Sequence, residues 1–215
     1  LRTRARLLDA ATRLFAETGF RRVTVRAICR AAHANVAAVN YHFRNKLGLY
    51  REVTEAGIAV LQETTDLAIK AGEHGTPEEK LRAYIDVVTR RLLSTAGHDW
   101  LPHLISHEMI DPTPALAALI DRGLRPRLDY LGKIVGEILR RPPDDRHVVE
   151  CVTSIHAQIL MFRSNPISDR LRAHAKMAHR SADAIADHIT AFSLAGVRAV
   201  EAKGAAADAS AGARR

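Results

Sequence analysis

The chain has 215 residues and a net charge of +8, and 47% of its residues are hydrophobic, a composition that fits a soluble globular protein of one large or two small domains. No stretch approaches the roughly 20 consecutive apolar residues of a membrane helix, and the basic start has no signal-peptide pattern, so we expect no membrane partner. The distant Cys29 and Cys151 exclude a disulfide framework or a cysteine-rich metal site, and they favour a cytoplasmic protein.

The positive charge is concentrated at the start of the chain. Residues 1–51 hold 11 Lys and Arg against two Asp and Glu, whereas residues 52–215 have a net charge of −1. An even scatter of charge would indicate only a solvated surface. A basic segment beside a nearly neutral remainder instead favours a polyanion as the partner of that segment.

Helical periodicity in the first third of the chain predicts a first helix, two short helices and a long fourth helix. An apolar stripe marks the first helix, which Gly19 ends, and Thr24 is placed to cap a second helix over residues 25–32. A third helix over residues 36–43 follows, and Asn45 begins a long fourth helix that runs toward Gly72. The stripe of the first helix consists of Leu7, Leu8, Ala11, Leu14 and Phe15.

The remainder of the chain also predicts helices. Thr76 and Glu79 form a capping box around Pro77, and a helix after residues 112–114 contains Pro126, where we expect a kink or a break. Two further helices are expected at residues 148–162 and 170–200, and the Gly/Ala-rich tail 201–215 is expected to be disordered. No strand pattern stands out, so the sequence predicts an all-α fold of about nine helices.

Two short helices joined by three residues and preceded by a longer one have the size and order of a helix-turn-helix. Its third helix, "VAAVNYHF", would enter the major groove of DNA. Val39 and Phe43 would face inward, while Asn40 and His42 would point outward. Lys46, at the start of the next helix, could meet a phosphate.

The stretch "VTVRAICRAAHANVAAVNYHFRNKLGLY", residues 23–50, resembles the DNA-binding domain of the TetR family of bacterial repressors. The resemblance implies a DNA-binding domain over residues 1–50, with phosphate or groove-edge contacts, anchors for the second helix, and side chains that face base edges. His33 stands where the family usually has Gly; histidine can adopt a positive φ at some cost, so the turn could differ slightly from the family's. The implied DNA-contacting set is Thr24, Arg26, Asn35, Val36, Ala37, Ala38, Asn40, Tyr41, His42 and Lys46.

The later stretch "EMIDPTPALAALIDRGLRPRLDYLGKIV" resembles, more weakly, the CecR-type subgroup of the same family. It implies that residues 51–200 form a helical domain that binds an effector and pairs two copies through the last two helices. Candidate effector contacts are Trp100, His103, His107, Met161 and Phe162, with core packing or a solvated surface as the alternative reading. The i, i+4 spacing of His103 and His107 suits a metal, but no HExxH pattern is present and we expect neither a metal nor a cofactor.

No nucleophile elbow, phosphate loop or paired catalytic carboxylates mark an enzyme. The leading hypothesis is a homodimeric repressor that binds a palindromic operator in double-stranded DNA and is released by a small-molecule effector. The alternative is a ligand-independent, architectural DNA-binding protein. An effector site in the second domain would separate these two hypotheses.

Overall fold

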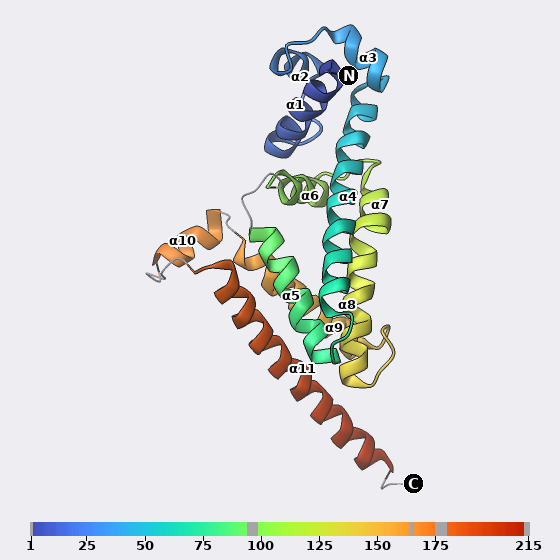
Figure 1. The fold of residues 1–215 in the computed structure, drawn as a ribbon, viewed down its shortest axis with the longest axis vertical. Coiled ribbons are helices and arrows are strands. Elements are labelled where there is room, and N and C mark those ends of the chain that lie inside the picture. Colours follow the sequence, from blue (N-terminus) through green and yellow to red (C-terminus); the bar gives the residue numbers. More distant parts are fainter. Residues whose placement is uncertain (1, 94–98, 164–165, 175–179, 213–215) are drawn as a thin grey trace. The chain divides into compact units, whose positions relative to one another are not determined.

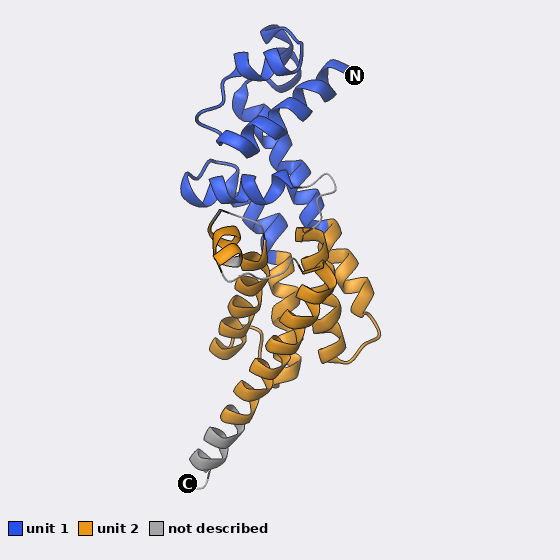
Figure 2. Cartoon of the chain, turned by 90° about the vertical axis from the view of Figure 1, so that its left-hand side faces the viewer, with its two compact units in different colours: residues 1–62, 95–125 blue, residues 63–94, 126–215 orange. Residues whose placement is uncertain are grey.

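The computed structural model describes residues 2–93, 99–163, 166–174 and 180–212, and within these ranges the regular structure is entirely helical (Figure 1). The chain divides into two compact units (Figure 2). Unit 1 comprises residues 1–62 and 95–125, and unit 2 comprises residues 63–94 and 126–215. None of the described helices is both long and apolar enough to span a bilayer.

Unit 1 begins with the three helices of the predicted helix-turn-helix. They are α1 (Arg2–Thr18), α2 (Val25–Ala31) and α3 (Val36–Phe43), and the long α4 (Lys46–Gly72) starts in the same unit. Gly19 ends α1 with φ +81°, and its N–H bonds the carbonyl of Phe15 at 2.9 Å, as expected for a C-terminal cap. The buried residues of this region include Leu7, Phe15, Ile28, Val39, Phe43 and Tyr50.

Unit 1 also contains α6 (Trp100–Ile110), α7 (Leu116–Ala118) and the π-helical segment η1 (Leu119–Leu124). Leu104 of α6 belongs to the same buried cluster as Phe15 and Tyr50. A smaller cluster joins Leu101 of α6 to Ile58 and Leu61 of α4. The predicted boundary at residue 50 therefore differs from the compact units, because α6 packs with the first three helices across a long sequence separation.

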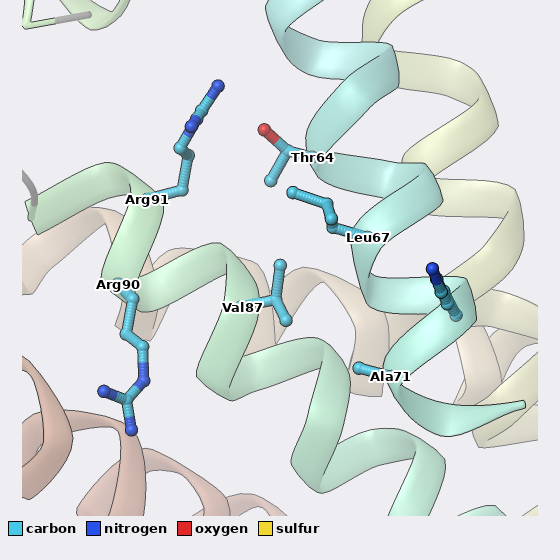
Figure 3. A pocket seen from close by; sticks show the side chains of 7 residues that line it. Thr64, Leu67, Ala71, Val87, Arg90 and Arg91 are labelled. Atoms are coloured by element: carbon cyan, nitrogen blue, oxygen red, sulfur yellow. The ribbon is translucent and has the colours of Figure 1, made fainter. Parts of the chain in front are cut away.

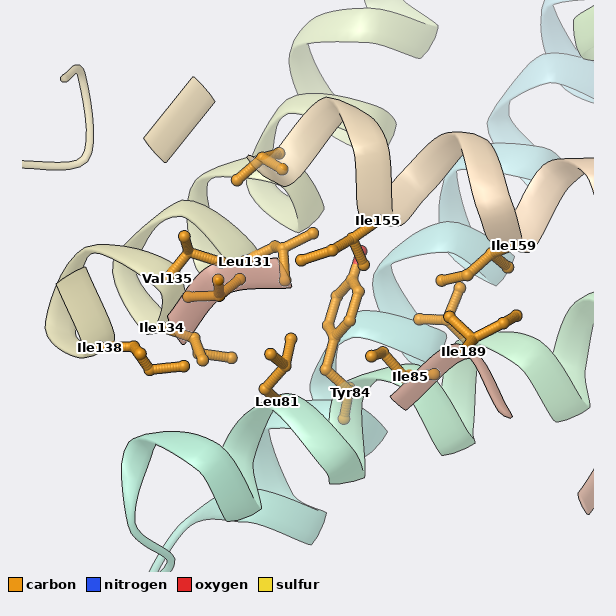
Figure 4. Packing of buried hydrophobic residues seen from close by; sticks show 14 of the residues in the cluster. Leu81, Tyr84, Ile85, Leu131, Ile134, Val135, Ile138, Ile155, Ile159 and Ile189 are labelled. Atoms are coloured by element: carbon orange, nitrogen blue, oxygen red, sulfur yellow. The ribbon is translucent and has the colours of Figure 1, made fainter. Parts of the chain in front are cut away.

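Unit 2 contains the end of α4 together with α5 (Pro77–Leu93), α8 (Arg125–Leu139), α9 (Arg146–Phe162), α10 (Pro166–His174) and α11 (Ala182–Gly212). Its core is an apolar cluster in which side chains from α5, α8, α9 and α11 meet (Figure 4). The predicted capping box starts α5: the Thr76 N–H donates to Glu79 Oε2 at 2.7 Å, and the Glu79 N–H donates to Thr76 Oγ1 at 3.3 Å.

Three helix predictions differ from the structure. The chain remains helical through Pro126, and the disturbance lies in η1 just before it, where the Arg122 carbonyl accepts a hydrogen bond from Gln62 Nε2 at 3.0 Å. A carbonyl four residues before a proline loses its helical donor, so a side-chain donor takes its place. The expected single helix 170–200 is replaced by α10 and α11, because Ser181 caps α11 through the Ala184 N–H at 3.2 Å. The expected disordered tail is helical to Gly212, in keeping with the high helix propensity of alanine, and residues 213–215 lie outside the described residues.

Candidate nucleic-acid interface

Helix α3 is held in place from one side and capped at its start. Val39 and Phe43 are buried in the unit 1 core, which confirms that they face inward. Asn35 caps the helix: its Oδ1 accepts a hydrogen bond from the Ala37 N–H at 3.0 Å. His33, in the turn before α3, adopts φ 48°, a left-handed conformation that glycine adopts more readily than histidine.

The opposite side of α3 faces solvent. Asn40 is exposed, and Tyr41 retains 85% of its accessible surface, which is unusual for a large aromatic side chain. The His42 ring is half-buried and lies edge-on to Tyr41, with the ring centroids 4.9 Å apart. Of the predicted DNA-contacting residues, the exposed ones are Thr24, Arg26, Asn35, Val36, Ala37, Asn40 and Tyr41, while Ala38, His42 and Lys46 are half-buried.

Helix α2 is positioned by Thr24. Its φ of −106° and ψ of 150° are those of an N-cap, and its Oγ1 accepts a hydrogen bond from the Ala27 N–H at 3.1 Å. Arg26 is exposed in the first turn of α2. The positive end of the α2 dipole and the Arg26 guanidinium can therefore act on the same phosphate.

Lys46, which is predicted to contact a phosphate, donates hydrogen bonds within the protein. Its Nζ donates to the carbonyls of Phe20 and Val23, each at 3.0 Å, and lies 4.3 Å from the centroid of the Phe20 ring. Burial lowers the pKa of this ammonium group. Lys46 therefore ties the segment between α1 and α2 to the start of α4. The sequence alone does not show whether a basic residue at a helix start binds carbonyl groups or phosphates.

A second support comes from α6. The Tyr50 hydroxyl donates a hydrogen bond to Glu108, which also accepts from the Thr113 N–H at 2.9 Å and from Thr113 Oγ1 at 2.7 Å. Burial, followed by the Glu108 carboxylate, raises the pKa of Tyr50. Sequence reasoning missed Glu108 as a structural residue, because nothing local shows that this glutamate is only 2% exposed.

His107, a predicted effector contact, belongs to this support instead. Its Nε2 lies 3.1 Å from the Ala16 carbonyl oxygen of α1, so it serves as the donor. A Cβ placed on Gly19 would lie 3.0 Å from His107 Nδ1, so the absence of a side chain at Gly19 lets the imidazole approach. Arg21 and Asp111 add an exposed ion pair at 2.7 Å.

The other predicted effector contacts are divided between the two units. Trp100 is half-buried against Gly57 in unit 1, and His103 is exposed in the same unit. Met161 and Phe162 belong to unit 2, where Met161 is 59% exposed and Phe162 packs on the core. No group of three or more metal-ligating side chains occurs among the described residues.

Unit 2 has a surface groove of about 590 Å³ between α4 and α5 (Figure 3). None of the predicted effector residues lines it. Arg90 at its edge is paired with Asp86 at 2.7 Å. The groove is lined by Thr64, Leu67, Lys70, Ala71, Val87, Arg90 and Arg91.

Known protein families match both parts of the chain. Residues 7–53 match the model of the bacterial regulatory proteins of the TetR family, and residues 77–197 match the C-terminal domain of the HTH-type transcriptional dual regulator CecR. The chain is 27% identical over 88 residues to the protein named probable HTH-type transcriptional regulator YttP of Bacillus subtilis (strain 168). That alignment covers 40% of this chain and 42% of YttP, so the chain spans less than half of this relative.

Solved structures share the fold. A TetR-like transcriptional regulator from Rhodococcus sp. RHA1 matches with a TM-score of 0.65 and 17% identity over 91% of this chain and 96% of that chain. The ketosteroid transcriptional regulator KstR2 of Mycobacterium tuberculosis matches with a TM-score of 0.64 and 18% identity over 90% and 93% of the two chains. The matched families are regulators rather than enzymes. The chain belongs to the TetR family of bacterial regulatory proteins and has a CecR-type C-terminal domain.

Proposed function

We propose that this regulator is a homodimeric repressor that reads a palindromic operator through α3 and leaves it when a small molecule binds unit 2. The observation that carries the proposal is the division of α3 into a buried side, with Val39 and Phe43, and an exposed side, with Asn40 and Tyr41. A helix so anchored presents its polar side chains to a major groove without unfolding.

Base discrimination falls mainly on Asn40. Its side chain is exposed and has no capping role, whereas Asn35 already uses its Oδ1 to cap α3. An asparagine amide can bridge N6 and N7 of adenine. Val36, Ala37 and Ala38 offer close approach or contact with thymine methyl groups. Thr24, Arg26, Tyr41 and His42 would contact the sugar-phosphate backbone or the groove edge.

The dimer would form through α9 and α11. On α9, Val149, Leu160 and Met161 are exposed, and on α11 Phe192 is 64% exposed. The two exposed surfaces adjoin, because the Phe162 and His188 rings lie 5.9 Å apart and Gln158 Nε2 is 3.3 Å from Ser193 Oγ. The α11 surface has small residues that allow a second helix to approach closely: Ala191, Ala195, Gly196 and Ala199. A contiguous apolar surface of this kind is typical of an interface.

The test is selection of binding sites from random duplex DNA at two salt concentrations, with the molar mass of the complex measured by light scattering. A palindrome with half-sites separated by whole helical turns, bound by two chains, is the expected result. Binding that is sensitive to salt without sequence enrichment would contradict the proposal and favour an architectural DNA-binding protein.

A further inference from the structure

Three polar side chains from three helices lie inside the apolar core of unit 2. Tyr84 of α5 is completely buried, Arg127 of α8 is 8% exposed, and His156 of α9 is half-buried with its Nδ1 atom inaccessible to solvent. Buried positions are most often occupied by apolar side chains, and arginine is among the residues least often buried. This group, the Tyr84–Arg127–His156 cluster, takes no part in the unit 1 site.

Two atoms of the cluster have unused hydrogen-bonding capacity. Among the described residues, none provides a hydrogen-bond partner for Tyr84 Oη or for His156 Nδ1. Buried polar atoms in folded proteins are nearly always paired, because losing water without a replacement costs free energy. A polar ligand that reaches the cluster would satisfy both atoms.

The charge of the cluster indicates the sign of that ligand. Burial raises the pKa of the Tyr84 phenol, and Arg127 opposes this rise, so the phenol stays neutral and able to donate. Burial, followed by the charge of Arg127, lowers the pKa of His156 to about 4, so the imidazole is neutral at pH 7. A guanidinium keeps its charge under these conditions. The cluster therefore offers one cation and two neutral hydrogen-bonding groups.

The surroundings indicate the rest of the ligand. Figure 4 shows the Tyr84 ring extending from α5 toward Ile155, with Leu131 and Ile85 beside it. A planar guanidinium matches the two oxygens of a carboxylate, and an apolar group attached to that carboxylate would pack against the aliphatic side chains.

We propose that the Tyr84–Arg127–His156 cluster binds the carboxylate of a small apolar acid, which is the effector of this regulator. Arg127 contacts the carboxylate in a bidentate manner, and the Tyr84 hydroxyl and the His156 Nδ1–H donate to it. The assignment rests on the proposed release by an effector. It places the site between α5, α8 and α9, away from the surface groove between α4 and α5.

The experiment measures binding of octanoate to the full chain by calorimetry, with octanol and octylamine as probes that keep the tail and change the head group. Octanoate is expected to bind and to raise the melting temperature, while the other two leave it unchanged. Arg127→Met should weaken octanoate binding about tenfold or more, and Tyr84→Phe should weaken it less. Tyr130→Phe is the matched control, because its ring lies 6.2 Å from that of Tyr84 outside the cluster.

Several results would overturn the proposal: no octanoate binding by the wild-type chain, equal binding of octanol, or unchanged octanoate affinity in Arg127→Met. Circular dichroism checks that this variant folds, and if it does not, Tyr84→Phe against Tyr130→Phe decides the question. Operator binding separates the two hypotheses. If the protein binds a palindrome as a dimer but does not bind octanoate, the proposed repressor function stands and the cluster is not its effector site. If octanoate binds in an Arg127-dependent manner but does not release the operator, the cluster is a binding site but its ligand is not the effector.

Discussion

The Tyr50 hydroxyl of α4 donates to the Glu108 carboxylate of α6 in the interior of unit 1, and both side chains are almost completely buried. The Phe15 and Phe20 rings enclose the phenol, with centroids 4.9 Å and 4.8 Å from that of Tyr50. This hydrogen bond joins α6 to the helices that position α3, so its loss should destabilise the whole unit.

We expect Tyr50→Phe to lower the free energy of unfolding by about 1–3 kcal/mol, because it leaves a buried carboxylate short of one donor. Urea unfolding at pH 7 measures this. Tyr41→Phe removes a hydroxyl from a side chain that is 85% exposed, and should change stability by less than about 0.5 kcal/mol. Equal stability of the two variants would mean that the Tyr50–Glu108 hydrogen bond contributes nothing.

Lys46→Ala should affect stability more than the salt dependence of DNA binding. Its ammonium bonds two carbonyls at 3.0 Å, and losing these charge-assisted hydrogen bonds should cost about 1–3 kcal/mol. Arg26→Ala, which removes an exposed cation, should leave stability unchanged and reduce the salt slope of DNA binding by about one. A reduced salt slope of DNA binding in Lys46→Ala, together with unchanged stability, would instead support a contact between Lys46 and a phosphate.

Alanine substitutions of Asn35 and Asn40 should have different effects on stability and on DNA binding. Asn35→Ala removes the N-cap and should lower the free energy of unfolding by about 1 kcal/mol. Asn40→Ala should leave stability nearly unchanged and lose about 1–3 kcal/mol of discrimination at one base pair of the selected operator. Competition binding against single-base operator variants measures this, and an unaltered preference in Asn40→Ala would exclude it as a base reader.

Phe192→Asp should produce a folded monomer with weak operator binding, because a charge would have to be buried between two copies of α11. Sedimentation velocity gives the oligomeric state and circular dichroism the helix content. Met109→Asp is the control: Met109 is 78% exposed but lies in unit 1. A Phe192→Asp protein that remains dimeric would place the interface elsewhere.

Acid should destabilise the fold through His156. Its pKa falls from 6.5 to about 4 on folding, so the unfolded chain binds more protons between these values and stability decreases as the pH falls through this range. The loss between pH 7 and pH 5 should be about 2 kcal/mol. His156→Gln should lack this component in unfolding measured at the two pH values. An identical pH dependence in wild type and variant would show that His156 is not buried as a neutral imidazole.

Most helix boundaries could be predicted from capping residues that lie next to them in the sequence. Thr24, Asn45 and the Thr76–Glu79 box act within one turn of the chain, so their capping roles could be predicted and the structure has all three. The break at Ser181 was missed, since the surrounding periodicity masks a single capping residue. The replacement of one helix by α10 and α11 follows from that residue.

The helical class, the helix-turn-helix with its inward Val39 and Phe43, and the family could all be predicted from the residues alone, because periodicity and caps depend on neighbours within a few positions. The partners of residues far apart in the chain became clear from the folded molecule. It placed Lys46 on two carbonyls, Glu108 on Tyr50, His107 on α1, and Arg127 beside Tyr84 and His156. A buried polar or charged side chain is stabilised by its neighbours in space, and those neighbours come from helices far apart in the chain.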